Sequence, residues 1–223
     1  MQTAEMFWDK AAEAYAKSPI GDVDAYEYTL GRTRSYLTPT DTVLELGCGT
    51  GSTALRLANG VRRIVASDIS SVMVGIGRAK ALEAGLRNVD FVTANLFDGA
   101  LDAAITGANP AAGSTAAGYD AVLALNLLHL IEDGEGALRR VHGLLKPGGV
   151  FISKTVCEPR NGAPLKFRLI RLALPLLQFF GKAPFVRFMD PDDFEALVVS
   201  TGFEILEAGD HPAPSRYIVA RKR

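Results

Sequence analysis

The feature that most constrains this chain is residues 42–57, where a short apolar run meets alternating glycines and then helix-forming residues. The run at 42–46 is typical of a strand buried in a parallel sheet. The glycines at 47, 49 and 51 predict a turn in which bare backbone can approach a ligand, because glycine has no Cβ. The segment therefore predicts a strand, a glycine turn and a helix, an arrangement that binds nucleotide-like ligands in α/β folds.

The glycine spacing separates this turn from a dinucleotide fingerprint. That fingerprint is G-x-G-x-x-G, whereas Gly47, Gly49 and Gly51 give G-x-G-x-G, with the third glycine one residue early. Glu45 adds a charge near the end of a buried strand, where it requires a polar partner. A tight turn without any ligand stays the alternative for the glycines alone.

The complete string VLELGCGTG closely resembles motif I of the class I S-adenosylmethionine-dependent methyltransferases, and LLKPGGVFI at 144–152 is typical of the same family. The resemblance implies an α/β fold: a Rossmann-like sheet of seven strands, mostly parallel, with a C-terminal antiparallel hairpin and helices on both faces. It also implies that the loop passes beneath the methionine part of S-adenosylmethionine, with Glu45 as polar support. The loop residues assigned to this cofactor are Gly47, Cys48, Gly49, Thr50 and Gly51.

A second apolar run at 63–68 ends in Asp68, which lies 17 residues after Gly51. An open α/β sheet places a carboxylate there beside the ribose hydroxyls, and its two acceptor oxygens suit a vicinal diol. We predict that Asp68 binds ribose, with capping of the next helix as the alternative. Ile69 is assigned to the same cofactor site. By the resemblance, Met73 packs near the adenine, with an ordinary core position as the alternative.

The third and fourth predicted strands, 89–95 and 119–125, carry the rest of the expected site. Asn95 and Leu96 stand where the family has an acid that contacts the adenine amino group, and asparagine keeps an acceptor oxygen. By the same resemblance, the end of the fourth strand, Leu125 and Asn126, faces the transferred methyl group. Between these strands, residues 99–118 predict a loop with one short helix.

His129 is the candidate general base, because a histidine has its ordinary pKa near neutrality. A histidine bonded to backbone at a helix start is the alternative. Residues 2–17 predict an amphipathic helix that resembles the leader of many small-molecule methyltransferases. In those leaders a tyrosine, here Tyr15, reaches the methionine end of the cofactor. Packing of this helix onto the domain is the alternative.

Residues 158–190 form an apolar insertion with a narrow polar stripe at 168, 171, 175 and 178. Pro175 predicts a kink or a split in its helix. Three interpretations stay open for this segment. It covers an apolar acceptor as a lid, which we favour; it packs in the core; or it makes a homodimer contact or a weak contact with a membrane surface.

Composition fits one domain over 1–223. We divide it into an N-terminal helical lid (1–40), a cofactor-binding core (41–157), the insertion (158–190), and a C-terminal helix and hairpin (191–223). A net charge of −1 gives no overall attraction to nucleic acid, and no apolar run reaches the ~18 residues that span a bilayer. Without a signal peptide or a disulfide framework, we expect a cytoplasmic protein with reduced cysteines. No metal-ligand cluster is expected.

These features together predict methyl transfer from S-adenosylmethionine to a small, apolar acceptor through an oxygen, nitrogen or carbon nucleophile. The sulfonium is already activated, so the protein mainly has to align it for in-line displacement. Two alternatives stay open. One is a nicotinamide-dependent oxidoreductase on a Rossmann sheet, and the other is a non-catalytic protein that binds S-adenosylmethionine.

Overall fold

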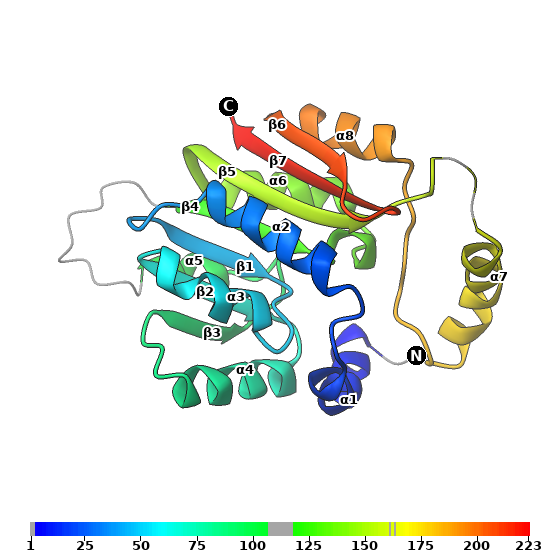
Figure 1. Ribbon diagram of the computed structural model, residues 1–223, viewed down its shortest axis with the longest axis horizontal. Coiled ribbons are helices and arrows are strands. Elements are labelled where there is room, and N and C mark those ends of the chain that lie inside the picture. Colours follow the sequence, from blue (N-terminus) through cyan, green and yellow to red (C-terminus); the bar gives the residue numbers. More distant parts are fainter. Residues whose placement is uncertain (1–2, 107–117, 161, 163) are drawn as a thin grey trace.

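A seven-stranded sheet lies between two layers of helices in the computed structural model, which describes residues 3–106, 118–160, 162 and 164–223 (Figure 1). The strand order is β3-β2-β1-β4-β5-β7-β6. Strands β1 to β5 are mutually parallel, and β7 is antiparallel to both of its neighbours. The predicted fold class is confirmed. The strands are β1 (Thr42–Leu46), β2 (Arg63–Asp68), β3 (Val89–Thr93), β4 (Tyr119–Leu125), β5 (Leu145–Val156), β6 (Phe203–Asp210) and β7 (Ser215–Lys222).

The position of β1 at the centre of the sheet explains why its residues do not alternate between apolar and polar. Leu44 pairs with Val65 of β2 on one side and with Val122 of β4 on the other. Every residue of β1 is buried, because helices cover both faces of the sheet at this point. A parallel strand covered on both faces has no solvent side, so its residues do not alternate between apolar and polar.

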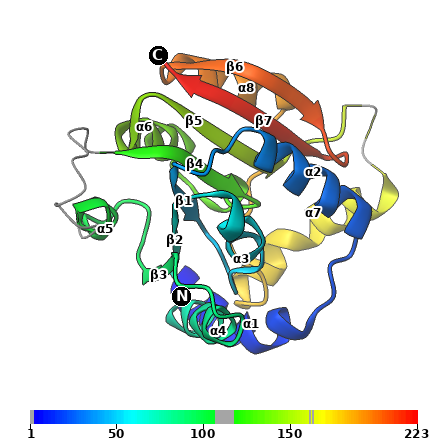
Figure 2. The ribbon, with the colours of Figure 1, turned by 60° about the vertical axis from the view of Figure 1, so that its left-hand side comes forward.

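Two separate apolar clusters form the core, one on each face of the sheet. Val43 belongs to the face covered by α2 (Val23–Ser35), α3 (Ser52–Leu57) and α4 (Ser71–Glu83). Leu44 belongs to the face covered by α5 (Ala100–Thr106), α6 (Gly134–Leu144) and α8 (Pro191–Ser200). Figure 2 shows the two layers from a second direction. The short helix predicted in the loop 99–118 is α5, and residues 107–117 of that loop lie outside the described residues.

Helix α1 (Ala4–Lys17) lies beyond the carboxyl ends of the strands, beside α4 (Figure 1). The carboxylate of Asp9 fixes it there. Asp9 Oδ1 accepts a hydrogen bond from the Ser70 hydroxyl at 2.6 Å and another from the backbone N–H of Val72 at 3.3 Å. These contacts hold α1 against the N-terminus of α4, next to the ends of β1 and β2.

Helix α7 (Leu165–Phe179) stands at the edge of the molecule, away from both core clusters (Figure 1). None of its described side chains is buried, so core packing is the wrong interpretation of the insertion. The helix continues through Pro175, and the split that this proline predicts does not occur. Apolar composition alone did not distinguish a buried helix from an exposed one.

Several strand boundaries differ from the predicted ones. The third strand ends at Thr93 rather than at residue 95, because the backbone N–H of Asn95 turns to the carboxylate of Asp98, 2.9 Å away. Such a side-chain hydrogen bond competes with the sheet ladder. The fifth strand, for which the sequence predicts residues 150–155, runs from Leu145 to Val156, and Leu145 pairs with Tyr119.

Candidate functional site

A cavity of about 300 Å³ lies at the carboxyl ends of β1, β2 and β4, between their loops and α1. The carboxyl ends of parallel strands are where open α/β sheets bind their ligands. Ten of the residues predicted to bind the cofactor meet in its wall: Tyr15, Gly47, Gly49, Asp68, Ile69, Met73, Asn95, Leu96, Leu125 and Asn126.

Sequence reasoning missed the other half of the wall. Some missed residues are direct neighbours of predicted ones, and α1 and the segment after β4 supply the rest. Only Trp8 carried a signal, since it lies on the same helix as Tyr15, and their rings approach edge to face at 6.5 Å. The missed residues are Ala4, Trp8, Leu46, Ser67, Ala94, Phe97, Leu127, Leu130, Ile131 and Glu132.

The glycine loop follows β1 with its three glycines in the left-handed region, at φ values of 64° for Gly47, 53° for Gly49 and 78° for Gly51. Residues with a Cβ rarely adopt this conformation. A Cβ on Gly49 would lie 3.5 Å from Cε1 of Tyr15, and both residues line the cavity. A side chain at position 49 would therefore occupy cavity space and not core space.

Gly51 serves a different purpose from Gly49. A Cβ on Gly51 would lie 2.5 Å from Cζ of Phe91, and a Cβ on Gly77 of α4 would collide with the same ring. The missing side chains of Gly51 and Gly77 thus make room for Phe91. Gly51 does not line the cavity, and neither do its neighbours Cys48 and Thr50. These three residues lie on the side of the loop away from the cavity. The Thr50 hydroxyl accepts a hydrogen bond from Lys80 Nζ at 3.0 Å, and the Cys48 N–H donates to the carbonyl of Ser67.

Asp68 presents its carboxylate at the cavity while two backbone N–H groups hold it. Oδ2 accepts from Gly49 and Oδ1 accepts from Ser70, each at 2.9 Å. Burial raises the pKa of Asp68, and these N–H groups oppose the rise. Capping of α4 is the wrong interpretation of Asp68, because the Ser70 hydroxyl accepts from the N–H of Met73 and caps that helix.

Glu45 lies behind the glycine loop and does not line the cavity. Its carboxyl group is buried, and its Oε2 has no hydrogen-bond partner within the described part of the chain. Burial raises the pKa of Glu45 to about 8. The group is therefore mostly protonated at neutral pH, which removes the cost of burying a charge.

His129 lies in the short helix η3 (Leu128–Leu130) after β4, and its ring does not line the cavity, although Leu127 and Leu130 do. Its Nδ1 is buried without a partner among the described residues, and burial lowers the pKa of His129 to about 4. Its carbonyl oxygen accepts from the N–H of Arg187 at 2.7 Å, which attaches the end of the insertion to η3. The structure does not bring the candidate base to the cavity.

Asn126 is the one non-glycine residue with a positive φ, at 61°, in the part of the chain that the structure describes. Its backbone N–H donates to the carbonyl of Lys154 at 2.7 Å, so β5 holds the strained turn in place. Strained backbone of this kind costs roughly 1–3 kcal/mol and gathers at functional sites. Asparagine tolerates the conformation better than most residues.

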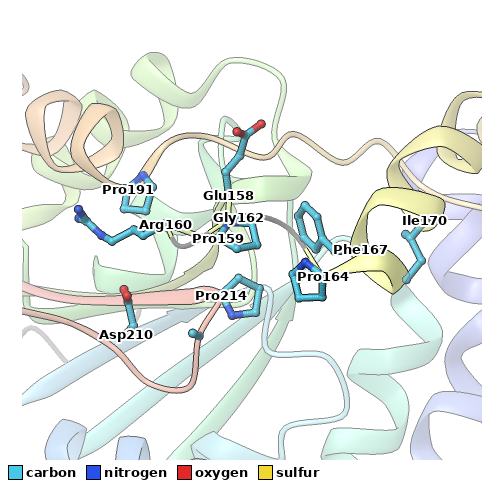
Figure 3. A pocket seen from close by; sticks show the side chains of 11 residues that line it. Glu158, Pro159, Arg160, Gly162, Pro164, Phe167, Ile170, Pro191, Asp210 and Pro214 are labelled. Carbon is cyan, nitrogen blue, oxygen red and sulfur yellow. The ribbon is translucent and has the colours of Figure 1, made fainter.

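A second cavity, of about 340 Å³, lies at the start of α7, where Phe167 and four prolines gather around it (Figure 3). No residue of the glycine loop reaches this cavity. Its three charged side chains already have partners: Arg160 with Asp192, Glu158 with Arg171, and Asp210 with Arg216. The described residues also contain no cluster of three or more metal-ligating side chains. The first cavity is therefore the candidate ligand site.

The wall of the first cavity fits a nucleoside attached to an amino acid. Leu46, Ala94 and Leu96 supply apolar surface, Asp68 supplies a carboxylate, and the glycine loop leaves the space that a Cβ at position 49 would fill. Together with the strand order, this arrangement defines an α/β protein of the class I methyltransferase fold.

Residues 44–151 match a family model described as a methyltransferase domain. An uncharacterized methyltransferase of Mycobacterium tuberculosis is 34% identical over 127 residues, and the match covers 55% of this chain and 55% of that relative. A ubiquinone biosynthesis O-methyltransferase of Pseudomonas paraeruginosa is 26% identical over 91% of this chain and 79% of its own length.

Among solved structures, magnesium protoporphyrin IX methyltransferase of Synechocystis with bound S-adenosylhomocysteine superposes with a TM-score of 0.67. It is 20% identical, and the alignment covers 97% of this chain and 94% of that one, a likeness that supports the fold. Over residues 44–151 the chain is thus similar to methyltransferase domains, and its fold is that of the class I methyltransferases.

Proposed function

We propose that the protein transfers a methyl group from S-adenosylmethionine to a small, apolar acceptor by in-line displacement. The observation that carries the proposal is the contact between Asp68 and Gly49 in the wall of the first cavity. This contact brings a carboxylate and open backbone to one ligand-sized space, which supports a role for Asp68 in binding ribose. The match to the mycobacterial relative spans only about half of that protein, so the activity of the whole chain is part of the proposal.

The roles of the residues follow from their places in the wall. Asp68 binds the ribose hydroxyls, Asn95 and Leu96 hold the adenine, and the backbone of Gly47 and Gly49 lies under the methionine part. When bound, S-adenosylmethionine supplies an electrophilic methyl group whose leaving group is a neutral thioether. The chain has to position the acceptor and exclude water around that methyl group, which is the main requirement of an already activated reagent. Trp8 and Tyr15 of α1 close the cavity for this purpose.

An apolar acceptor fits the surface beyond these contacts. Phe97, Leu127, Leu130 and Ile131 line the cavity on the side of β3 and β4, and a relative is named for ubiquinone biosynthesis. If the acceptor arrives protonated, it needs a base, and His129 stays our candidate for that role. At neutral pH its imidazole is uncharged, but with a pKa of about 4 it is a weak base in its buried position. Its ring would have to turn toward the cavity to act as the base.

Three further assignments stay proposals. The division into an N-terminal lid, a core, an insertion and a C-terminal hairpin is supported by the position of α1 over the cavity. The lid role of the insertion is unsupported in this conformation, since no described residue of α7 lines the first cavity. A cytoplasmic location is supported by the two free, buried cysteines, Cys48 and Cys157.

Binding and turnover test the function in two stages. Calorimetric titration with S-adenosylmethionine, S-adenosylhomocysteine and NAD should show binding of the first two only. Release of S-adenosylhomocysteine is then measured with phenols, amines and enolisable ketones, each with and without an apolar chain. We expect release that depends on an acceptor and is faster with the apolar chain. Binding without release from any acceptor would favour a non-catalytic binding protein, and NAD binding would favour the oxidoreductase.

A further inference from the structure

Helix α7 carries a continuous stripe of exposed apolar side chains along its outer surface. The residues follow the i, i+4, i+7, i+11, i+14 spacing that places side chains on one side of a helix. Each of them is at least 57% exposed: Leu165, Leu169, Leu172, Leu176 and Phe179. Monomeric proteins rarely leave so many large apolar side chains together in water, so this surface is expected to have a partner.

The opposite side of α7 already has its contacts. Phe167 packs on Phe188 with ring centroids 4.9 Å apart, and Gln178 Nε2 donates to the carbonyl of Pro184 at 2.9 Å. Phe167 and Ile170 also reach into the second cavity (Figure 3). These contacts fix the orientation of the helix. The apolar stripe is therefore held facing outward.

The charge of the surrounding segment identifies the partner. Residues 159–189 contain six basic residues and no acidic one, in a chain whose net charge is −1. Arg168 and Lys182 are exposed, and no ion pair to either occurs among the described residues. An exposed apolar stripe with basic residues beside it is the pattern of a helix that lies in the surface of an anionic membrane.

We infer that α7 docks this protein on anionic lipid bilayers. The helix lies in the plane of the interface, with Leu172 and Phe179 among the acyl chains and Arg168 and Lys182 at the lipid headgroups. No helix of the described residues is long and apolar enough to cross a membrane. A second copy of the chain is a poorer partner, because the unpaired basic side chains Arg168 and Lys182 of the two copies would repel each other.

The position of α7 gives the docking a direction. The helix stands on the side of the molecule where the carboxyl ends of the parallel strands lie (Figure 1). The same ends form the wall of the first cavity. A protein resting on α7 therefore turns that side toward the bilayer. The inference does not depend on methyl transfer, because lipid binding is measurable without cofactor or acceptor.

Vesicle sedimentation tests the inference. The full chain is expected to sediment with vesicles that mix phosphatidylglycerol and phosphatidylcholine, and much less with phosphatidylcholine alone. Binding should weaken as salt is raised, because headgroup attraction is screened. Absence of binding to the mixed vesicles would overturn the inference.

Two pairs of variants locate the surface. Leu172→Ser with Phe179→Ser should lower binding roughly tenfold or more, since two apolar side chains no longer leave water. Leu82→Ser with Val199→Ser, exposed residues of α4 and α8, should leave it unchanged. Arg168→Gln with Lys182→Gln should reduce the preference for anionic lipid, whereas Arg87→Gln with Arg223→Gln should not.

Three results would overturn the assignment to α7. One is unchanged lipid binding by the Leu172 and Phe179 variant. Another is a sharp drop in its melting temperature, which would mean that these side chains are buried. The third is elution of that variant as a smaller species than the wild type, which would identify the stripe as an interface between copies of the chain.

Discussion

The Asp68 carboxylate accepts a hydrogen bond from the backbone N–H of Gly49, with 2.9 Å between the two atoms. This contact connects the end of β2 to the loop that follows β1. Both residues also line the first cavity. One side chain therefore holds the glycine loop in place and remains next to the space where a ligand binds.

Replacing Asp68 should weaken cofactor binding. Asp68→Ala removes an acceptor for the ribose and releases the Gly49 N–H, so we expect a loss of roughly 1–3 kcal/mol in binding free energy by calorimetry. Asp90→Ala on β3 is the matched control, because this carboxylate is half exposed and pairs with Arg63 away from the cavity. Unchanged affinity in a folded Asp68→Ala protein would remove Asp68 from the site.

Gly49→Val should abolish cofactor binding with a smaller effect on the fold. The new side chain would enter the cavity beside Tyr15, and φ is 53° at this position. The control is Gly75→Ala on the exposed side of α4, where a Cβ meets nothing within 4 Å. That change should stabilise the protein by about 0.5–1 kcal/mol and leave affinity as it was. Normal affinity of folded Gly49→Val would contradict the role of the glycine loop.

Gly51→Ala should show the opposite pattern, with a loss of stability as its first effect. Its Cβ would overlap Phe91, and overpacking of this kind costs typically 1–3 kcal/mol, to which the positive φ of 78° adds strain. Denaturant unfolding measures the loss. The same glycine change made in a Phe91→Leu background should cost less, because the ring is gone. Equal costs in both backgrounds would show that the overlap with Phe91 is unimportant.

Glu45 predicts a dependence of stability on pH. Its pKa is about 8 in the folded protein against about 4.5 when unfolded, so its contribution to stability is complete below pH 4.5 and is lost as pH rises through 8. The loss approaches about 1.4 kcal/mol per pH unit between these values. Glutamine does not titrate, so the stability of Glu45→Gln relative to the wild type should increase as pH rises from 5 to 8. If the free energies of unfolding of the two proteins changed with pH in the same way, Glu45 would not be a buried, protonated carboxyl group.

His129 predicts a dependence of the opposite sign. Its folded pKa of about 4 lies below its unfolded value of 6.5, so its contribution to stability is complete above pH 6.5 and is lost as pH falls toward 4. His129→Gln should flatten the unfolding profile over that range. Turnover of the same variant tests the role as a base, because loss of a general base costs typically a hundredfold or more. Unchanged turnover would leave His129 with a structural role alone.

The sequence predicted the strands that are buried on both faces and the cavity wall that follows directly from them. The ends of β2 and β4 agree with the predicted ranges, because a short apolar run in an α/β chain favours a buried strand over other structures. Gly49 and Asp68 reach the wall because Asp68 ends β2 and Gly49 lies in the loop that follows β1. Positions fixed by the path of the backbone were thus predictable.

Positions fixed by side-chain packing were not predictable from the sequence. Gly51 and Gly49 have the same spacing in the sequence, yet one faces Phe91 and the other the cavity. The motif could not separate them, since the difference depends on a ring that comes forty residues later. The same limit applies to α7, whose apolar sequence is compatible with either burial or exposure. The side on which His129 lies was also undetermined, because η3 sets the direction of its ring.

Phe91 occupies space that two glycines from different elements leave open, Gly51 at the start of α3 and Gly77 within α4. This arrangement restricts the order in which the three positions can diverge among related proteins. A larger residue at 77 is acceptable only after position 91 has become smaller, so relatives should pair an aromatic residue at 91 with glycine at 77. Gly51 has the additional requirement of a positive φ and should stay glycine in both groups of relatives. Covariation between positions 77 and 91 in related sequences, with position 51 always glycine, would show that this packing has restricted substitution.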